Sequence, residues 1–285
     1  SVIGGWVIKY LAEYVLGHGT QLAEEGYFST FIADGMSTEL CFIIFSLCTL
    51  AVIYAGVRNG VERVSRLMMP VLVVLSVLIA GYSVTRPGAL AGVKYFLVPN
   101  IKHFSWMTVV SAMGQMFYSL SIAMGILITF GSYMKKDISI EGSTRNVEVF
   151  DTAIAIMAGL MIIPAVFAFS GGDPAALNAG PSLMFITIPK VFDSMGLGTV
   201  IGVAFFLLVL FAAATSAVSL LETNVQSVAQ EFKLNRKGSI IFGMIEVISV
   251  GIITILGYSV FKNFHPLAFI ERYQGFDILD TLDFV

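Results

Sequence analysis

Charged residues are scarce in this chain. Only 12% of the 285 residues are Asp, Glu, Lys or Arg, whereas 57% are hydrophobic and the mean hydropathy is +0.88. Soluble domains carry about twice this share of charge, so the composition indicates an integral membrane protein. The net charge of −3 provides no basic footprint, and nucleic acid is therefore excluded as an expected partner.

Cysteine and histidine are also rare. Cys41 and Cys48 lie seven positions apart in one apolar stretch, so they share a helix face and are interpreted as small buried hydrophobes rather than a disulfide or metal site. His18, His103 and His265 fall in separate predicted loops. The sequence has no nucleophile elbow, no His/Glu metal spacing and no phosphate-binding loop. We therefore predict that the protein is not an enzyme.

The chain has no initiator methionine and no signal peptide, and it ends just as another apolar segment begins. We expect residues 1–285 to form one membrane domain that is truncated at both ends.

Seven segments approach the roughly 20 apolar residues that cross a bilayer. The first is short and contains Lys9 and Glu13, which are four positions apart and can pair on one helix face. The pattern predicts an all-α integral membrane protein. The predicted spans are 1–17, 38–57, 67–85, 107–131, 149–169, 197–221 and 239–261.

Basic residues favour alternate connections between these spans. Nine lie close to span ends in the connections near Arg58, Lys135 and Arg236, against six spread over the longer opposite connections. Positive charge close to span ends marks the cytoplasmic side. The loops near Arg58, Lys135 and Arg236 are therefore predicted to be cytoplasmic.

The stretch 113–131, MGQMFYSLSIAMGILITFG, has polar and small residues in the middle of a span. Serine hydroxyls compete for backbone groups, and glycine gives the helix no side-chain support. Irregular backbone at membrane depth points to a transporter binding site. Composition alone leaves open a continuous helix that packs closely through its small residues.

Asp151 stands at the start of the predicted span 149–169. An acidic residue at membrane depth suggests ion coordination. The alternative is an N-cap at the cytoplasmic interface, where aspartate satisfies free amides and the helix dipole. The residues themselves leave both interpretations open.

Residues 211–219, FAAATSAVS, place Thr215, Ser216 and Ser219 in an otherwise apolar stretch. Hydroxyl and carbonyl oxygens are hard donors that suit an alkali cation. Serine and threonine in membrane helices also bond back to the carbonyl four residues earlier, and small residues permit tight helix packing. The motif alone does not decide between these roles.

Taken together, these stretches resemble the neurotransmitter:sodium symporter family in its bacterial amino-acid-transporting branch. The similarity covers nearly the whole chain in the family's order. The matching runs are GGWVIKY (4–10), GVRNGVERVSRLMMPVL (56–72), MGQMFYSLSIAMG (113–125), DTAIAIMAGLMIIPAVFAF (151–169), FITIPKVF (185–192), FAAATSAVSLLE (211–222) and FDILD (276–280).

The resemblance implies a partial inverted-repeat (5+5) sodium-symporter fold in the cell inner (plasma) membrane. The chain would span the family's third to ninth helices and the start of the tenth, with 113–131 as the discontinuous sixth helix. The family's first helix, which supplies half of both sodium sites, would be missing. The fragment alone is therefore expected to be inactive.

The resemblance also assigns roles around the predicted break. Tyr118 would be an aromatic lid over the substrate, and Ser119 would bind the first sodium ion and contact the substrate. Ser121, Ala123 and Met124 would line the side-chain pocket. Ala123 stands where the family commonly has glycine, so the pocket wall gains a methyl group.

Two sodium sites are implied, each incomplete in this fragment. Asp151 falls where relatives carry an asparagine ligand of the first sodium ion, and its fixed carboxylate implies chloride independence. The Ala212 carbonyl with the Thr215 and Ser216 hydroxyls would form the second site.

The leading hypothesis is thus a sodium-coupled symporter that imports an amino acid by alternating access. Because Tyr118, Ala123 and Met124 are uncharged, an apolar or aromatic substrate is predicted. Two alternatives stay open: a symporter of another small zwitterion, and a transporter-like sensor that binds an amino acid without moving it. The sequence makes no prediction of oligomeric state.

Overall fold

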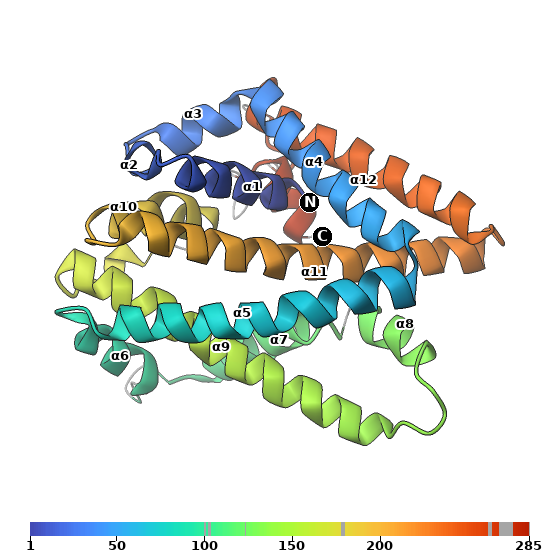
Figure 1. Cartoon of the computed structure of the whole chain (residues 1–285), viewed down its shortest axis with the longest axis horizontal. Helices are drawn as coiled ribbons and strands as arrows, with labels where there is room; N and C mark the ends of the chain where they lie inside the picture. Colours follow the sequence, from blue (N-terminus) through green and yellow to red (C-terminus); the bar gives the residue numbers. More distant parts are fainter. Residues whose placement is uncertain are drawn as a thin grey trace.

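The computed structural model describes residues 1–99, 101, 104–122, 124–177, 180–261, 264–267 and 276–284. Every regular element in these residues is a helix (Figure 1). The predicted all-α fold class is confirmed.

Among the residues that the structure describes, five helices are long and apolar enough to cross a membrane. Their bounds are α4 Gly35–Tyr54, α5 Arg63–Val84, α9 Ile140–Ser170, α11 Gly198–Glu231 and α12 Arg236–Tyr258. The shorter helices are α2 Gly19–Leu22, α3 Tyr27–Ala33, α6 Ala89–Leu97, α10 Ile188–Asp193 and α13 Ile278–Phe284.

The two longest helices extend beyond their apolar runs. Helix α9 begins at Ile140, nine positions before the predicted span, because the hydroxyl of Ser139 accepts a hydrogen bond from the Gly142 amide (3.2 Å) and caps it there. Helix α11 continues to Glu231, ten residues past the predicted end at 221. Hydropathy measures only the apolar length, and both helices continue past it into polar residues.

Helix α1, Val2–Val15, is only 14 residues long and packs against α4 and α11. Its approach to α4 depends on Gly5, since a Cβ atom there would lie 2.7 Å from the backbone nitrogen of Phe42. Trp6 and Tyr10 of α1 are fully buried, and the Tyr10 hydroxyl donates to the Phe185 carbonyl (2.9 Å). Aromatic packing around α1 therefore forms the centre of the hydrophobic core.

The stretch 113–131 is broken, as predicted. Helix α7, Trp106–Ser119, ends in mid-segment, and six residues separate it from α8, Ile126–Ser132. Ser121 has a φ of 54°, which non-glycine residues rarely adopt, and Gly125 has a φ of 71°. The alternative of a continuous, closely packed helix is therefore wrong.

The three basic connections lie at the same end of the molecule, on the right in Figure 1. The π-helical turn Val57–Glu62 joins α4 to α5 there, the end of α8 lies close by, and α11 turns into α12. The connections that carry these basic residues therefore lie on one side of the molecule.

Candidate functional site

A cavity of about 310 Å³ opens at the break between α7 and α8. It is walled by the break itself, the end of α7, the start of α8, the middle of α11 and Met69 of α5. The lining residues are Met69, Tyr118, Ser119, Ser121, Met124, Ile126, Thr215, Ser216, Ser219 and Leu220. Four of the five predicted substrate residues and both predicted hydroxyl ligands of the second sodium ion thus meet in one place. Ala123, the fifth substrate residue, lies outside the described residues.

The local backbone explains how the break presents polar groups. Helix α7 ends in a Schellman motif, in which the Ile122 amide donates to the Phe117 carbonyl (3.1 Å) and the Ser121 amide donates to the Tyr118 carbonyl (3.0 Å). Ser121 then reverses the chain in the left-handed region, and Gly125 starts α8 in the same region. A Cβ at Gly125 would lie 3.6 Å from the methyl group of Thr223, so the break packs directly against α11.

Ser119 and Asp151 are in direct contact. The Ser119 hydroxyl donates a hydrogen bond of 2.7 Å to Asp151 Oδ1. Asp151 is the twelfth residue of α9, which is capped by Ser139. The N-cap interpretation of Asp151 is therefore wrong, and the carboxylate instead reaches the break from the body of a membrane-length helix.

The Thr215 hydroxyl bonds to carbonyls of its own helix, as threonines in membrane helices often do. Its hydroxyl donates to the carbonyls of Phe211 and Ala212, both at 3.0 Å. This leaves the lone pairs of Oγ1 available to a cation. Ser216 is exposed and lines the cavity. Ala212 adjoins the cavity through its bond to Thr215 without lining it.

Sequence reasoning did not assign four of the lining residues to the site: Met69, Ile126, Ser219 and Leu220. Ser219 was visible as the third hydroxyl of its run. Met69 precedes the proline inside α5, and only tertiary packing places it beside the break. None of the described residues that line the cavity is Lys, Arg or His.

A second polar cluster ties α8 to three other elements. Glu222 of α11 is fully buried, and both of its oxygens accept hydrogen bonds of 2.9 Å from the Arg236 guanidinium. The same guanidinium donates to the Ile53 carbonyl at the end of α4 (3.2 Å). The Tyr133 hydroxyl, just after α8, donates to Glu222 Oε1 (2.9 Å).

Burial, and then the hydrogen bond to Glu222, raise the pKa of Tyr133 to about 12. No sequence motif assigned a role to Glu222 or Tyr133. A glutamate inside a long apolar helix is nevertheless a signal for such a cluster, because a buried charge requires a partner.

Comparisons with known proteins agree with this geometry. Residues 12–269 match the model of the Sodium:neurotransmitter symporter family. The chain is 35% identical over 269 residues to the uncharacterized sodium-dependent transporter YhdH of Bacillus subtilis, covering 93% of this chain and 58% of that protein. An uncharacterized sodium-dependent transporter of Haemophilus influenzae is 29% identical, with 92% and 58% covered. The chain thus spans about 58% of the length of these relatives.

A crystal structure of MhsT in complex with L-phenylalanine matches with a TM-score of 0.83 and 36% identity. The match covers 99% of this chain and 63% of that one. Fold, broken helix and family model therefore agree over nearly the entire sequence. The chain belongs to the sodium:neurotransmitter symporter family.

Proposed function

We propose that the full-length protein is a sodium-coupled symporter that imports an amino acid by alternating access. The carrying observation is that Ser119, in contact with Asp151, shares one cavity with Thr215 and Ser216 at the break between α7 and α8. Oxygen ligands for cations and an irregular backbone thus occur together at membrane depth.

Two sodium ions supply the positive charge that no described side chain of this cavity provides. Ser119 and Asp151 contribute to the first site; the Ala212 carbonyl and the Thr215 and Ser216 hydroxyls contribute to the second. A substrate carboxylate removed from water without a partner is prohibitively costly. No cationic side chain lines the described cavity, so substrate binding depends on bound sodium. This dependence couples the transport of the substrate to the transport of sodium.

The substrate is an amino acid with an apolar or aromatic side chain. The hydrophobic part of the lining consists of Met69, Tyr118, Met124, Ile126 and Leu220. MhsT, whose structure is similar, was crystallised with L-phenylalanine. A methyl-scale change in such a pocket contributes only about 1–3 kcal/mol of discrimination, so several related amino acids should compete.

The protein is oriented in the cell inner (plasma) membrane with the connections near Arg58, Lys135 and Arg236 in the cytoplasm. This is supported by their common position at one end of the molecule and by the positive-inside rule. Each sodium ion entering down the membrane potential provides about 2.3 kcal/mol per 100 mV, in addition to its concentration gradient. This free energy is sufficient to drive accumulation of the substrate against its own concentration gradient.

The test is uptake of labelled phenylalanine and leucine into proteoliposomes that contain the full-length protein, with sodium or with choline outside. Uptake only in sodium supports the proposal. Equal uptake in choline contradicts sodium coupling and leaves Ser119, Thr215 and Ser216 as helix-packing residues. Saturable binding without uptake identifies the sensor instead.

A further inference from the structure

A separate cavity of about 260 Å³, the outer cavity, lies where the end of α1 and α2 meet the end of α10 and the start of α11. Its polar walls include Tyr14, Thr20, Asp193 and Thr199. It shares no lining residue with the cavity at the break between α7 and α8, the substrate cavity. Helices α2 and α10 lie at the end of the molecule opposite to the basic connections (Figure 1). In the orientation proposed above, this end is the outer side.

Tyr14 lines the outer cavity, and its buried hydroxyl has no hydrogen-bond partner among the described residues. The residue is 2% exposed, and its ring stacks on Phe206 with centroids 5.4 Å apart. Two glycines fix the ring: a Cβ at Gly19 would lie 2.9 Å from Tyr14 Cε1, and a Cβ at Gly202 would clash with the same ring. Because the ring cannot swing away and an unpartnered buried hydroxyl is costly, a bound group that accepts its proton is indicated.

The start of α11 brings free backbone donors to the same cavity. Its N-cap residue, Leu197, offers no side-chain acceptor. The amides of Thr199 and Val200, in the first turn, have no acceptor in the part of the chain that the structure describes. Both residues line the cavity. Free amides at the positive end of a 34-residue helix, together with a buried tyrosine hydroxyl, favour a carboxylate group.

Asp193, the last residue of α10, adds an exposed carboxylate to the opposite kind of wall. None of the described residues that line the cavity is Lys, Arg or His. Lys190 of the same helix is engaged by Glu25 (3.5 Å). An anion alone would be repelled by Asp193, and a cation alone would leave the buried hydroxyl and the helix amides without acceptors. A ligand that carries both a carboxylate and an ammonium group satisfies all of these groups.

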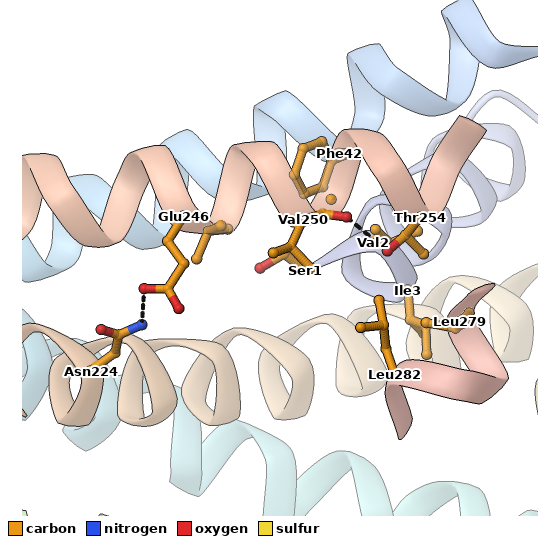
Figure 2. Close-up of a pocket in the computed structure, with 12 residues that line it drawn as sticks. Ser1, Val2, Ile3, Phe42, Asn224, Glu246, Val250, Thr254, Leu279 and Leu282 are labelled. Atoms are coloured by element: carbon orange, nitrogen blue, oxygen red, sulfur yellow. Dashed lines mark hydrogen bonds between the residues drawn. The ribbon is translucent and has the colours of Figure 1, made fainter. Parts of the chain in front are cut away.

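Figure 2 shows a different pocket, in which the polar side chains already satisfy one another or their own helix. The Asn224 amide donates to Glu246 (2.8 Å), and the Thr254 hydroxyl donates to the Val250 carbonyl (2.8 Å). That pocket therefore makes no demand for a ligand. The outer cavity differs from it by the open, buried donor of Tyr14.

We propose that the outer cavity binds a small zwitterion, an α-amino acid, at a site separate from the substrate cavity and from both proposed sodium sites. The ligand carboxylate accepts hydrogen bonds from the Tyr14 hydroxyl and from the amides of Thr199 and Val200. The ligand ammonium group pairs with Asp193, and an apolar side chain lies against Leu197. A bound amino acid thus connects α1, α10 and α11 on the outer side.

The test is equilibrium binding of labelled leucine to the full-length protein in lipid nanodiscs, with choline in place of sodium. Without sodium, the substrate cavity lacks the cations that its proposed binding requires, so the remaining binding reports on the outer cavity. Tyr14→Phe keeps the ring and removes only the hydroxyl. Tyr54→Phe, at an exposed tyrosine that ends α4, is the matched control. We expect saturable binding that is weakened at least about fivefold in Tyr14→Phe and unchanged in Tyr54→Phe.

Competition identifies the ligand groups that the cavity recognises. Isopentylamine is leucine without its carboxylate, and isocaproate is leucine without its ammonium group. We expect each to compete at least about tenfold more weakly than leucine, because each leaves one set of partners unpaired. Competition by either analogue that equals that of leucine overturns the zwitterion assignment.

Two further results overturn the proposal: no saturable leucine binding in choline, or equal leucine affinity of wild type and Tyr14→Phe. Binding in choline that is lost in Asp151→Ala and kept in Tyr14→Phe places the leucine in the substrate cavity. That result overturns the outer site and contradicts the sodium dependence of the substrate cavity as well. Sodium-dependent uptake decides the symport assignment separately, so failure of one proposal is distinguishable from failure of the other.

Discussion

The Ser119 hydroxyl lies 2.7 Å from Asp151 Oδ1, although the two residues are 32 positions apart. This bond connects the last residue of α7, where the broken segment begins, to the body of α9. It places a hydroxyl and a carboxylate, both hard oxygen donors, beside a cavity that no described cationic side chain lines.

Replacement of Asp151 should weaken sodium dependence. In Asp151→Ala we expect the sodium concentration for half-maximal uptake to rise at least about tenfold, the equivalent of 1.4 kcal/mol, because a charged ligand is lost. Asp151→Asn keeps an oxygen and should show a smaller rise, together with a new response to chloride. Uptake is measured against sodium at fixed substrate. An unchanged sodium response in Asp151→Ala would remove this residue from the site.

Thr215→Val separates cation binding from helix packing, because valine has nearly the same shape but no oxygen. We expect at least a several-fold loss of sodium affinity with little change in thermal stability. Thr144→Val is the control, since the Thr144 hydroxyl makes the same type of bond to the Ile140 carbonyl on the exposed end of α9. If the two variants behave alike in sodium titrations, Thr215 only supports the helix.

The ion pair between Arg236 and Glu222 should contribute strongly to the free energy of unfolding. Arg236→Met leaves the fully buried Glu222 without its cation, so the free energy of unfolding should fall by about 3 kcal/mol. The neighbouring exposed Lys237→Met should change it by less than about 0.5 kcal/mol. Unfolding in detergent measures both. Similar values for the two variants would show that the pair contributes nothing specific.

We predict that the free energy of unfolding falls at alkaline pH because Tyr133 ionises. Its pKa is raised from 10.0 to about 12 in the folded protein, so between these values the folded state retains a proton that the unfolded chain has lost. Stability therefore falls as pH rises through this window. The stability advantage of wild type over Tyr133→Phe should shrink between pH 10 and pH 12. A constant difference between them would contradict the raised pKa of Tyr133, which comes first from burial and then from the hydrogen bond to Glu222.

Sequence patterns predicted the helical class and the break because both depend on local chemistry. The serines and glycines of 113–131 weaken the helix wherever that segment lies, and the structure has its break at 120–125 as a result. The interpretation of Asp151 needed the helix boundary. Hydropathy placed the residue at the edge of a span, whereas the cap at Ser139 puts it well inside α9.

The rest of the site depends on tertiary packing. Nothing in the neighbourhood of Met69 indicates that it faces the break, because α5 approaches from a distant part of the chain.

Accumulation driven by a sodium gradient tests the central claim most directly. Proteoliposomes with the full-length protein receive labelled phenylalanine under an inward sodium gradient, and then again after an ionophore has equalised sodium at the same external concentration. The account predicts that internal phenylalanine rises above the external level only while the gradient exists. Equal internal and external levels under both conditions would contradict sodium-coupled symport.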